Sequence, residues 1–135
     1  MTPAQDPYPD RLRQRRACLI TTANPATERD RITILSGELP ATGLLSGGTI
    51  HADLRYIADR DVITAEALAR YFDAAAQEHC ETLEEYADMV LNDLANELVP
   101  RWIWLRLQNG GHQVIQQDQQ PAWDNHGLLD TIDFS

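Results

Sequence analysis

The sequence predicts an α+β domain in which two helices lie on one face of an antiparallel four-stranded sheet. Three observations lead to this prediction. Residues 49–57 alternate apolar and polar side chains, residues 64–98 carry apolar side chains at helical spacing, and residues 102–116 return to strand-like patterns around a Gly-Gly turn. Strands at both ends of the chain with helices grouped between them are typical of this class.

The length of 135 residues gives room for one domain, which we place at residues 17–116. Residues 1–16 are polar and interrupted by proline, so we expect an N-terminal arm. Residues 117–135 form a polar, acidic C-terminal tail, in which Trp123 and Phe134 are candidate anchors. No apolar run is long enough to span a bilayer or to direct secretion, so we expect a cytoplasmic protein that contacts no membrane.

The charge of the chain excludes some functions. There are 21 acidic residues against 11 basic ones, giving a net charge of -10, and every basic residue is an arginine. We expect no nucleic-acid partner, because neutralising phosphates needs clustered positive charge. Schiff-base chemistry is excluded because it requires a lysine amine. The one basic cluster is expected to be a solvated part of the arm, with a local anion contact as the alternative; it contains Arg11, Arg13, Arg15 and Arg16.

The first half of the domain contains the strand signals. Residues 18–22 and 32–35 are short β-branched runs separated by Asn24-Pro25, a pattern that suits a hairpin. A glycine-rich segment at 43–48 then leads into residues 49–57. Four apolar residues alternate with polar ones there, as in a half-buried strand: Ile50, Ala52, Leu54 and Tyr56.

The middle of the chain is predicted to be helical. Apolar residues fall on one face of residues 64–79, at spacings of three and four. A capping box at 82–85 starts the second helix: the Thr82 hydroxyl can accept a hydrogen bond from the Glu85 amide while Glu85 reaches back. Pro100 ends that helix.

The last elements are a strand at 102–107, a turn at Gly110-Gly111 and a returning strand at 112–116. Trp102 and Trp104 share one face of the strand, where we expect core or interface packing rather than stacking on a ligand. A sheet of this kind has unpaired edge strands, which invite pairing with other subunits. We therefore expect an oligomer.

A set of residues between 32 and 115 occurs in an order and spacing shared with a known family. The shared residues are Pro40, Thr42, Gly43, Thr49, Ile50, Tyr56, Ile57, Asp59, Leu68, Tyr71, Glu84, Asn92, Asp93, Leu94, Pro100, Arg101, Gly110 and Gly111. The chain thereby resembles the tunnelling-fold (T-fold) family and, within it, the NADPH-dependent reductases of the queuosine pathway that act on the nitrile of 7-cyano-7-deazaguanine. The resemblance implies a ββααββ fold, assembly into an oligomeric barrel, and sites between subunits.

This chain departs from the family at the positions that carry the chemistry. The nucleophilic Cys of the family's Cys-Pro-x-Thr-Gly segment corresponds to Leu39, and the Asp that donates a proton corresponds to Ser46. Leucine cannot form the thioimide intermediate, and a hydroxyl is a poor acid at neutral pH. The His that precedes the substrate-anchoring Glu corresponds to Leu83. We therefore expect the chain to be inactive as a nitrile reductase.

The cofactor positions also differ. The basic groups that the resemblance places near the NADPH phosphates correspond to Glu66, Ala69 and Asn109. A carboxylate at the first of these positions would repel a phosphate. We therefore expect no cofactor.

Glu84 is the family residue that remains. The resemblance implies that it accepts hydrogen bonds from the N–H edge of a purine or pterin ring, since a carboxylate can bind two adjacent donors. The alternative is an exposed glutamate that is favoured at a helix start. If a ligand pocket survives, the corresponding family positions predict that it also includes Thr64, Leu83, Ser46 and Leu39.

Three functional hypotheses follow. The first is a protein that has lost the reductase chemistry and binds a purine- or pterin-like heterocycle through Glu84, or that instead pairs with an active T-fold homologue. The second is an enzyme with different chemistry on such a heterocycle, using Glu38, Glu84, Ser46 or Cys80 in new roles. The third is the reductase reaction itself, which Leu39 argues against. The four histidines show no metal-ligand spacing, so we expect no metal. The two cysteines, Cys18 and Cys80, are expected to be buried free thiols.

Overall fold

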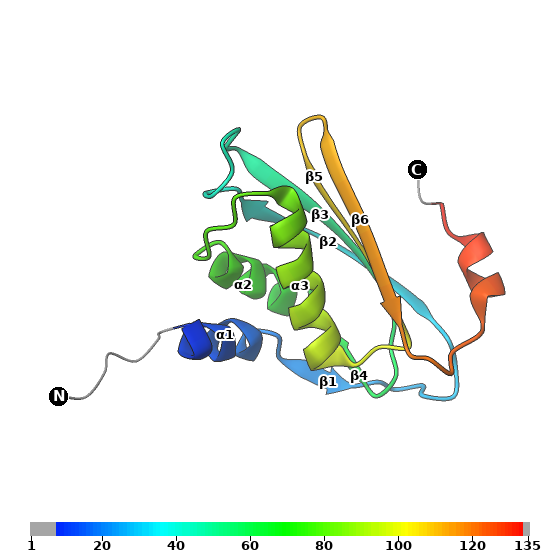
Figure 1. Cartoon of the computed structure of the whole chain (residues 1–135). Coiled ribbons are helices and arrows are strands. Elements are labelled where there is room, and N and C mark those ends of the chain that lie inside the picture. The colour runs from blue at the N-terminus through cyan, green and yellow to red at the C-terminus, as the bar shows by residue number, and fades with distance from the viewer. Residues whose placement is uncertain (1–7, 134–135) are drawn as a thin grey trace.

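A computed structural model describes residues 8–133 of the chain (Figure 1). Within that range no helix is both long enough and apolar enough to cross a membrane. The elements in chain order are α1 (Tyr8–Ala17), β1 (Thr21–Ala23), β2 (Ile32–Pro40), β3 (Thr49–Ile57), β4 (Asp61–Ile63), α2 (Ala65–Ala75), α3 (Leu83–Leu98), β5 (Trp102–Asn109), β6 (His112–Gln119) and the 3-10 helix η1 (His126–Thr131).

The main sheet has four antiparallel strands in the order β2-β3-β5-β6. Helix α2 packs over β2, and α3 packs over β5 and β6, so both helices cover the same face (Figure 1). The predicted α+β class, with this sheet and two helices on one face, is confirmed. Strands β3 and β5 are neighbours in the sheet, and the connection between them contains β4, α2 and α3.

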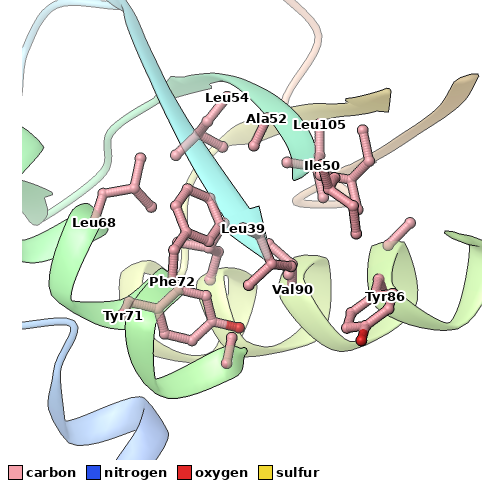
Figure 2. Packing of buried hydrophobic residues seen from close by; sticks show 14 of the residues in the cluster. Leu39, Ile50, Ala52, Leu54, Leu68, Tyr71, Phe72, Tyr86, Val90 and Leu105 are labelled. Carbon is pink, nitrogen blue, oxygen red and sulfur yellow. The ribbon is translucent and has the colours of Figure 1, made fainter. Parts of the chain in front are cut away.

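The helix-facing side of the sheet forms the main core. Ala52, Leu54 and Tyr56 of β3 pair with Leu107, Leu105 and Ile103 of β5, and all are buried. Helix residues pack onto this layer at the spacing that the sequence predicts, as Figure 2 shows for Phe72, Tyr71 and Val90. The alternation predicted for residues 49–57 is therefore confirmed.

The opposite face of the sheet carries a smaller apolar cluster. Trp102 and Trp104 lie there beside Ile57, and the segment after β6 covers them with Trp123. Trp123 is 9% exposed, and its indole Nε1 donates to Asp30 Oδ2 at 2.9 Å. The predicted packing of the first two tryptophans and the anchoring role of the third are confirmed. The second candidate anchor, Phe134, lies outside the described residues.

Two strand predictions need correction. Residues 21–23 do not form a hairpin with the strand that begins at Ile32; β1 pairs with β4, and β2 pairs with β3 across residues 41–48. Short β-branched runs show that strands exist but do not specify their partners, and the longer alternation in β2 and β3 decides the pairing. Strand β6 also continues to Gln119, three residues beyond the predicted end at Gln116.

The prediction of a solvated arm is wrong in part, because two arginines of α1 form ion pairs with Asp93 of α3. Arg15 is 3% exposed and donates from Nε to Asp93 Oδ2 at 2.5 Å, while Arg16 Nε donates to Asp93 Oδ1 at 2.8 Å. The Tyr71 hydroxyl donates to Asp93 Oδ2 at 2.5 Å. Burial, followed by the negative charge of Asp93, raises the pKa of Tyr71 well above its ordinary value. Composition alone predicted solvation because α1 has no apolar face.

Replacing Asp93 by Asn should strongly destabilise the protein. The substitution removes the charge that compensates Arg15 and Arg16, and breaking a buried pair from one side costs about 3–5 kcal/mol. Urea denaturation followed by circular dichroism measures the free energy of unfolding. Asp73→Asn, at an exposed position of α2, is the control and should change it by less than about 0.5 kcal/mol. Equal losses in the two variants would contradict the role given to Asp93.

Candidate functional site

A cleft of about 520 Å³ lies at one end of the sheet. Three segments meet there: the loop between β2 and β3, the start of α3, and the turn between β5 and β6, which lie together at the upper end of the sheet in Figure 1. Four residues singled out in the sequence line this cleft, namely Ser46, Leu83, Glu84 and Asn109. They are joined by His112, to which the sequence assigned no role.

The start of α3 decides where Glu84 points. The Thr82 hydroxyl oxygen accepts from the Glu85 amide at 3.1 Å, and the Thr82 hydroxyl lies 3.3 Å from Glu85 Oε1. This confirms the predicted cap on the Glu85 amide, and the Glu85 carboxylate reaches back to the Thr82 hydroxyl. Because Glu85 is engaged with the cap, the adjacent Glu84 side chain is free to extend toward the β5–β6 turn.

Glu84 forms a close pair with His112. Its Oε1 lies 2.7 Å from His112 Nε2, and the two side chains are 56% and 54% exposed. The hydrogen bond from its own backbone amide and then the one from His112 hold the pKa of Glu84 below its ordinary value. His112 reaches this position because Gly110, at φ 59°, reverses the chain directly before β6.

Ser46 and Asn109 fasten the β2–β3 loop to the hairpin tip. The Ser46 hydroxyl donates to Asn109 Oδ1 at 2.8 Å, and Asn109 Nδ2 donates to the carbonyl oxygens of Gly47 at 3.0 Å and Thr49 at 3.3 Å. With these bonds, both side chains hold the β2–β3 loop in place at the edge of the cleft. The Ser46 proton is directed at an amide oxygen, which does not favour its use as an acid.

The same loop is also held against the turn that precedes α3. The amide of Gly43 donates to the Tyr86 hydroxyl at 3.1 Å. A Cβ atom at Gly43 would lie 2.1 Å from the carbonyl oxygen of Cys80, so only glycine allows this close approach. The loop therefore owes its position at the rim of the cleft to Gly43 and Asn109.

The other predicted site residues are not brought to the cleft. Leu39 is fully buried on the helix-facing side of β2, so its side chain belongs to the core (Figure 2). Thr64 caps α2 by accepting from the Ala67 amide at 3.1 Å. Glu66 and Ala69 are exposed on α2 and do not line the cleft. Leu83 lines the cleft but is only 1% exposed, so its side chain contributes apolar surface at the base of the cleft.

The two remaining candidate groups are placed elsewhere. Glu38 lies on the face of the sheet opposite to Leu39, where its Oε1 is 3.4 Å from His51 Nδ1. Cys80 is 9% exposed, and burial, followed by the charges of Glu85 and Glu78, raises its pKa to about 11. Its thiol therefore stays protonated at neutral pH and is a poor nucleophile. Across residues 8–133, no three His, Cys, Asp or Glu side chains gather to hold a metal ion.

Comparison with known proteins gives no further assignment: no family model and no curated protein matches the chain. The resemblance to the nitrile reductases thus stays a prediction from motifs. His112 is the residue that the sequence did not reveal. Its partner Glu84 is 28 positions away, and only the capping box and the Gly-Gly turn taken together would have placed the two side chains at the same end of the sheet.

Replacing Gly43 by Ala should displace the β2–β3 loop. The added methyl group meets the Cys80 carbonyl, so the bond from Gly43 to Tyr86 should break and stability should fall by about 1–3 kcal/mol. Gly111→Ala is the matched control, because a Cβ there meets nothing within 4 Å. Urea denaturation of both variants measures the difference. A tolerated Gly43→Ala would show that the loop does not depend on this contact.

The Glu84 carboxyl should titrate below pH 4.5, its ordinary value. In His112→Ala its pKa should rise but stay depressed, because the backbone amide of Glu84 is the larger cause. The lowered pKa means that any stability from this pair is present above the unfolded-state pKa and is lost as the pH falls through the folded-state pKa. Carboxyl carbon NMR shifts measure the titration. An unchanged Glu84 pKa in His112→Ala would contradict the pairing.

Proposed function

We propose that the chain binds a purine- or pterin-like heterocycle through Glu84, in a cleft shared with a neighbouring subunit, and does not reduce nitriles. The observation that carries this proposal is the Glu84 carboxylate at the edge of a cleft of about 520 Å³. A carboxylate accepts two charge-assisted hydrogen bonds, which matches a ring N–H beside an amino group.

The charge of the cleft supports a ligand that is rich in N–H donors. Glu81 and Glu84 both line it, and none of its described lining residues is an arginine. Two carboxylates favour donor groups and repel phosphates. This agrees with the expectation that no NADPH is used. Asn109, one of the positions where the resemblance places a basic contact, instead holds the loop through Gly47 and Thr49.

The placement of the candidate reactive groups supports the absence of reduction. The residue at the nucleophile position, Leu39, is enclosed in the core. The residue at the acid position, Ser46, donates its proton to Asn109. The raised pKa of Cys80 keeps the buried thiol protonated, so it does not replace the missing nucleophile.

The edges of the sheet support a shared cleft. Strands β2 and β6 are the outer strands of the described sheet, and they expose Ile34 and Ile115. Leu45, on the loop that borders the cleft, is fully exposed. A neighbouring subunit, either a second copy or a T-fold homologue, would remove these side chains from water while covering the cleft. We therefore include assembly into a homo-oligomer or a mixed T-fold complex in the proposal.

Guanine, 7-deazaguanines and pterins should raise the melting temperature of the wild-type protein. A ligand at a hundred times its Kd stabilises the folded state by about 2.7 kcal/mol. In Glu84→Gln the gain should vanish, because an amide offers a donor where the ligand also donates. Glu66→Gln, an exposed change outside the cleft, should respond like the wild type. Differential scanning fluorimetry measures each shift.

Two outcomes would contradict this function. If none of these heterocycles stabilises the wild type, the cleft is not a binding site for them. If 7-cyano-7-deazaguanine causes NADPH oxidation, followed by absorbance, the chain is a reductase despite Leu39 and Ser46. We expect no such oxidation.

A further inference from the structure

The imidazole of His112 is the only aromatic ring among the described residues that line the cleft. Its backbone is held in place, because His112 pairs with Asn109 at the end of the β5–β6 ladder and Asn109 is tied to the β2–β3 loop. Its side chain is 54% exposed, so a ligand in the cleft can reach the ring. A residue with a fixed backbone and an accessible ring is well placed to contact a ligand.

The contact with Glu84 decides which ring nitrogen of His112 carries the proton. At neutral pH the Glu84 carboxylate is ionised and can only accept hydrogen bonds. The bond of 2.7 Å therefore requires that Nε2 of His112 donates. In a neutral imidazole the other nitrogen, Nδ1, is then an acceptor. With His112 neutral, the pair presents acceptors at two separate places, the Glu84 carboxylate and Nδ1 of His112.

We infer that His112 is a second ligand-contacting residue of the cleft, and that its Nδ1 accepts a hydrogen bond from the molecule that Glu84 binds. This inference rests on the proposed function and narrows the ligand class. The Glu84 carboxylate lies beside Nε2, and the acceptor Nδ1 lies on a different edge of the ring. The ligand must therefore offer donor groups at two separated positions, one for the carboxylate and one for Nδ1. A planar amino-substituted heterocycle with N–H or amino groups on two edges meets this requirement. A ring that presents carbonyl or unprotonated ring nitrogens to both acceptors does not.

The tautomer is tested without any ligand. Long-range ¹⁵N–¹H NMR correlation on the full-length protein at neutral pH should show His112 protonated on Nε2. In Glu84→Ala, which lacks the carboxylate, this preference should weaken toward that of a free imidazole. A wild-type His112 protonated on Nδ1 would overturn the inference and would leave heterocycle binding by Glu84 standing.

The role of Nδ1 is tested with two variants that separate it from Nε2. The amide of His112→Gln can still reach Glu84 as Nε2 does, but it provides nothing in the place of Nδ1. The amide oxygen of His112→Asn can replace the Nδ1 acceptor, but its side chain is too short to keep the bond to Glu84. Isothermal titration calorimetry with pterin as the probe should show the Gln variant binding about three- to tenfold more weakly than wild type, the range expected for one hydrogen bond. The Asn variant should bind more tightly than the Gln variant.

The possible results separate the two proposals. If His112→Gln binds pterin like the wild type, His112 only positions Glu84 and the inference is wrong, although the proposed function holds. If the wild type binds neither pterin nor guanine, the proposed function fails and the inference fails with it, whatever the tautomer. Melting temperatures of both variants, measured without ligand, show whether a weaker affinity reflects a loss of folded protein.

Discussion

The helix layer depends on one buried carboxylate. Asp93 is 1% exposed, and a charge withdrawn from water in this way must be compensated by hydrogen bonds and an opposite charge. Arg15 and Arg16 supply the charge from α1, and Tyr71 supplies a hydroxyl from α2. Because Asp93 belongs to α3, these bonds join α1, α2 and α3 and fix the rotation of α3. That rotation turns Leu83 and Val90 inward and places Glu84, which follows Leu83, against His112 of the β5–β6 hairpin.

The sequence predicted the elements that local patterns determine. The alternation of Ile50, Ala52, Leu54 and Tyr56, the helical spacing of Leu68 and Tyr71, and the Thr82 cap are all properties of neighbouring residues, and all were found. The pairing of β1 with β4 and the docking of α1 were not predicted. Arg15 meets its partner 78 positions further along the chain, and no local pattern marks an arginine that will be buried. Long-range charge pairing is thus the part of this fold that periodicity does not reveal.

The site was predicted to a similar extent and for the same reason. Glu84 was singled out because it matches the anchoring Glu of the family, and the structure brings it together with Ser46, Leu83 and Asn109 at the cleft. Leu39 and Thr64 came from the resemblance alone; the first lies in the core and the second caps a helix. His112 was not predicted because its contact with Glu84 joins a helix start to a hairpin turn, and no local sequence pattern shows that these two segments meet. Correspondence with family positions therefore indicated segments that border the cleft, but it did not indicate which side chains meet there.

The exposure of Glu84 would link the proposed ligand binding to the proposed assembly. At 56% exposure, water competes for the carboxylate, and an added hydrogen bond contributes little free energy in so polar a setting. The same bond becomes stronger when the cleft is covered and water is excluded. Within the described chain the cleft is bordered by the fully exposed Leu45, whose apolar side chain gains free energy when it is buried. A subunit that covers this loop would therefore both stabilise the assembly and strengthen the hold of Glu84 on a ligand, so the binding of a heterocycle and the association of subunits are expected to favour each other.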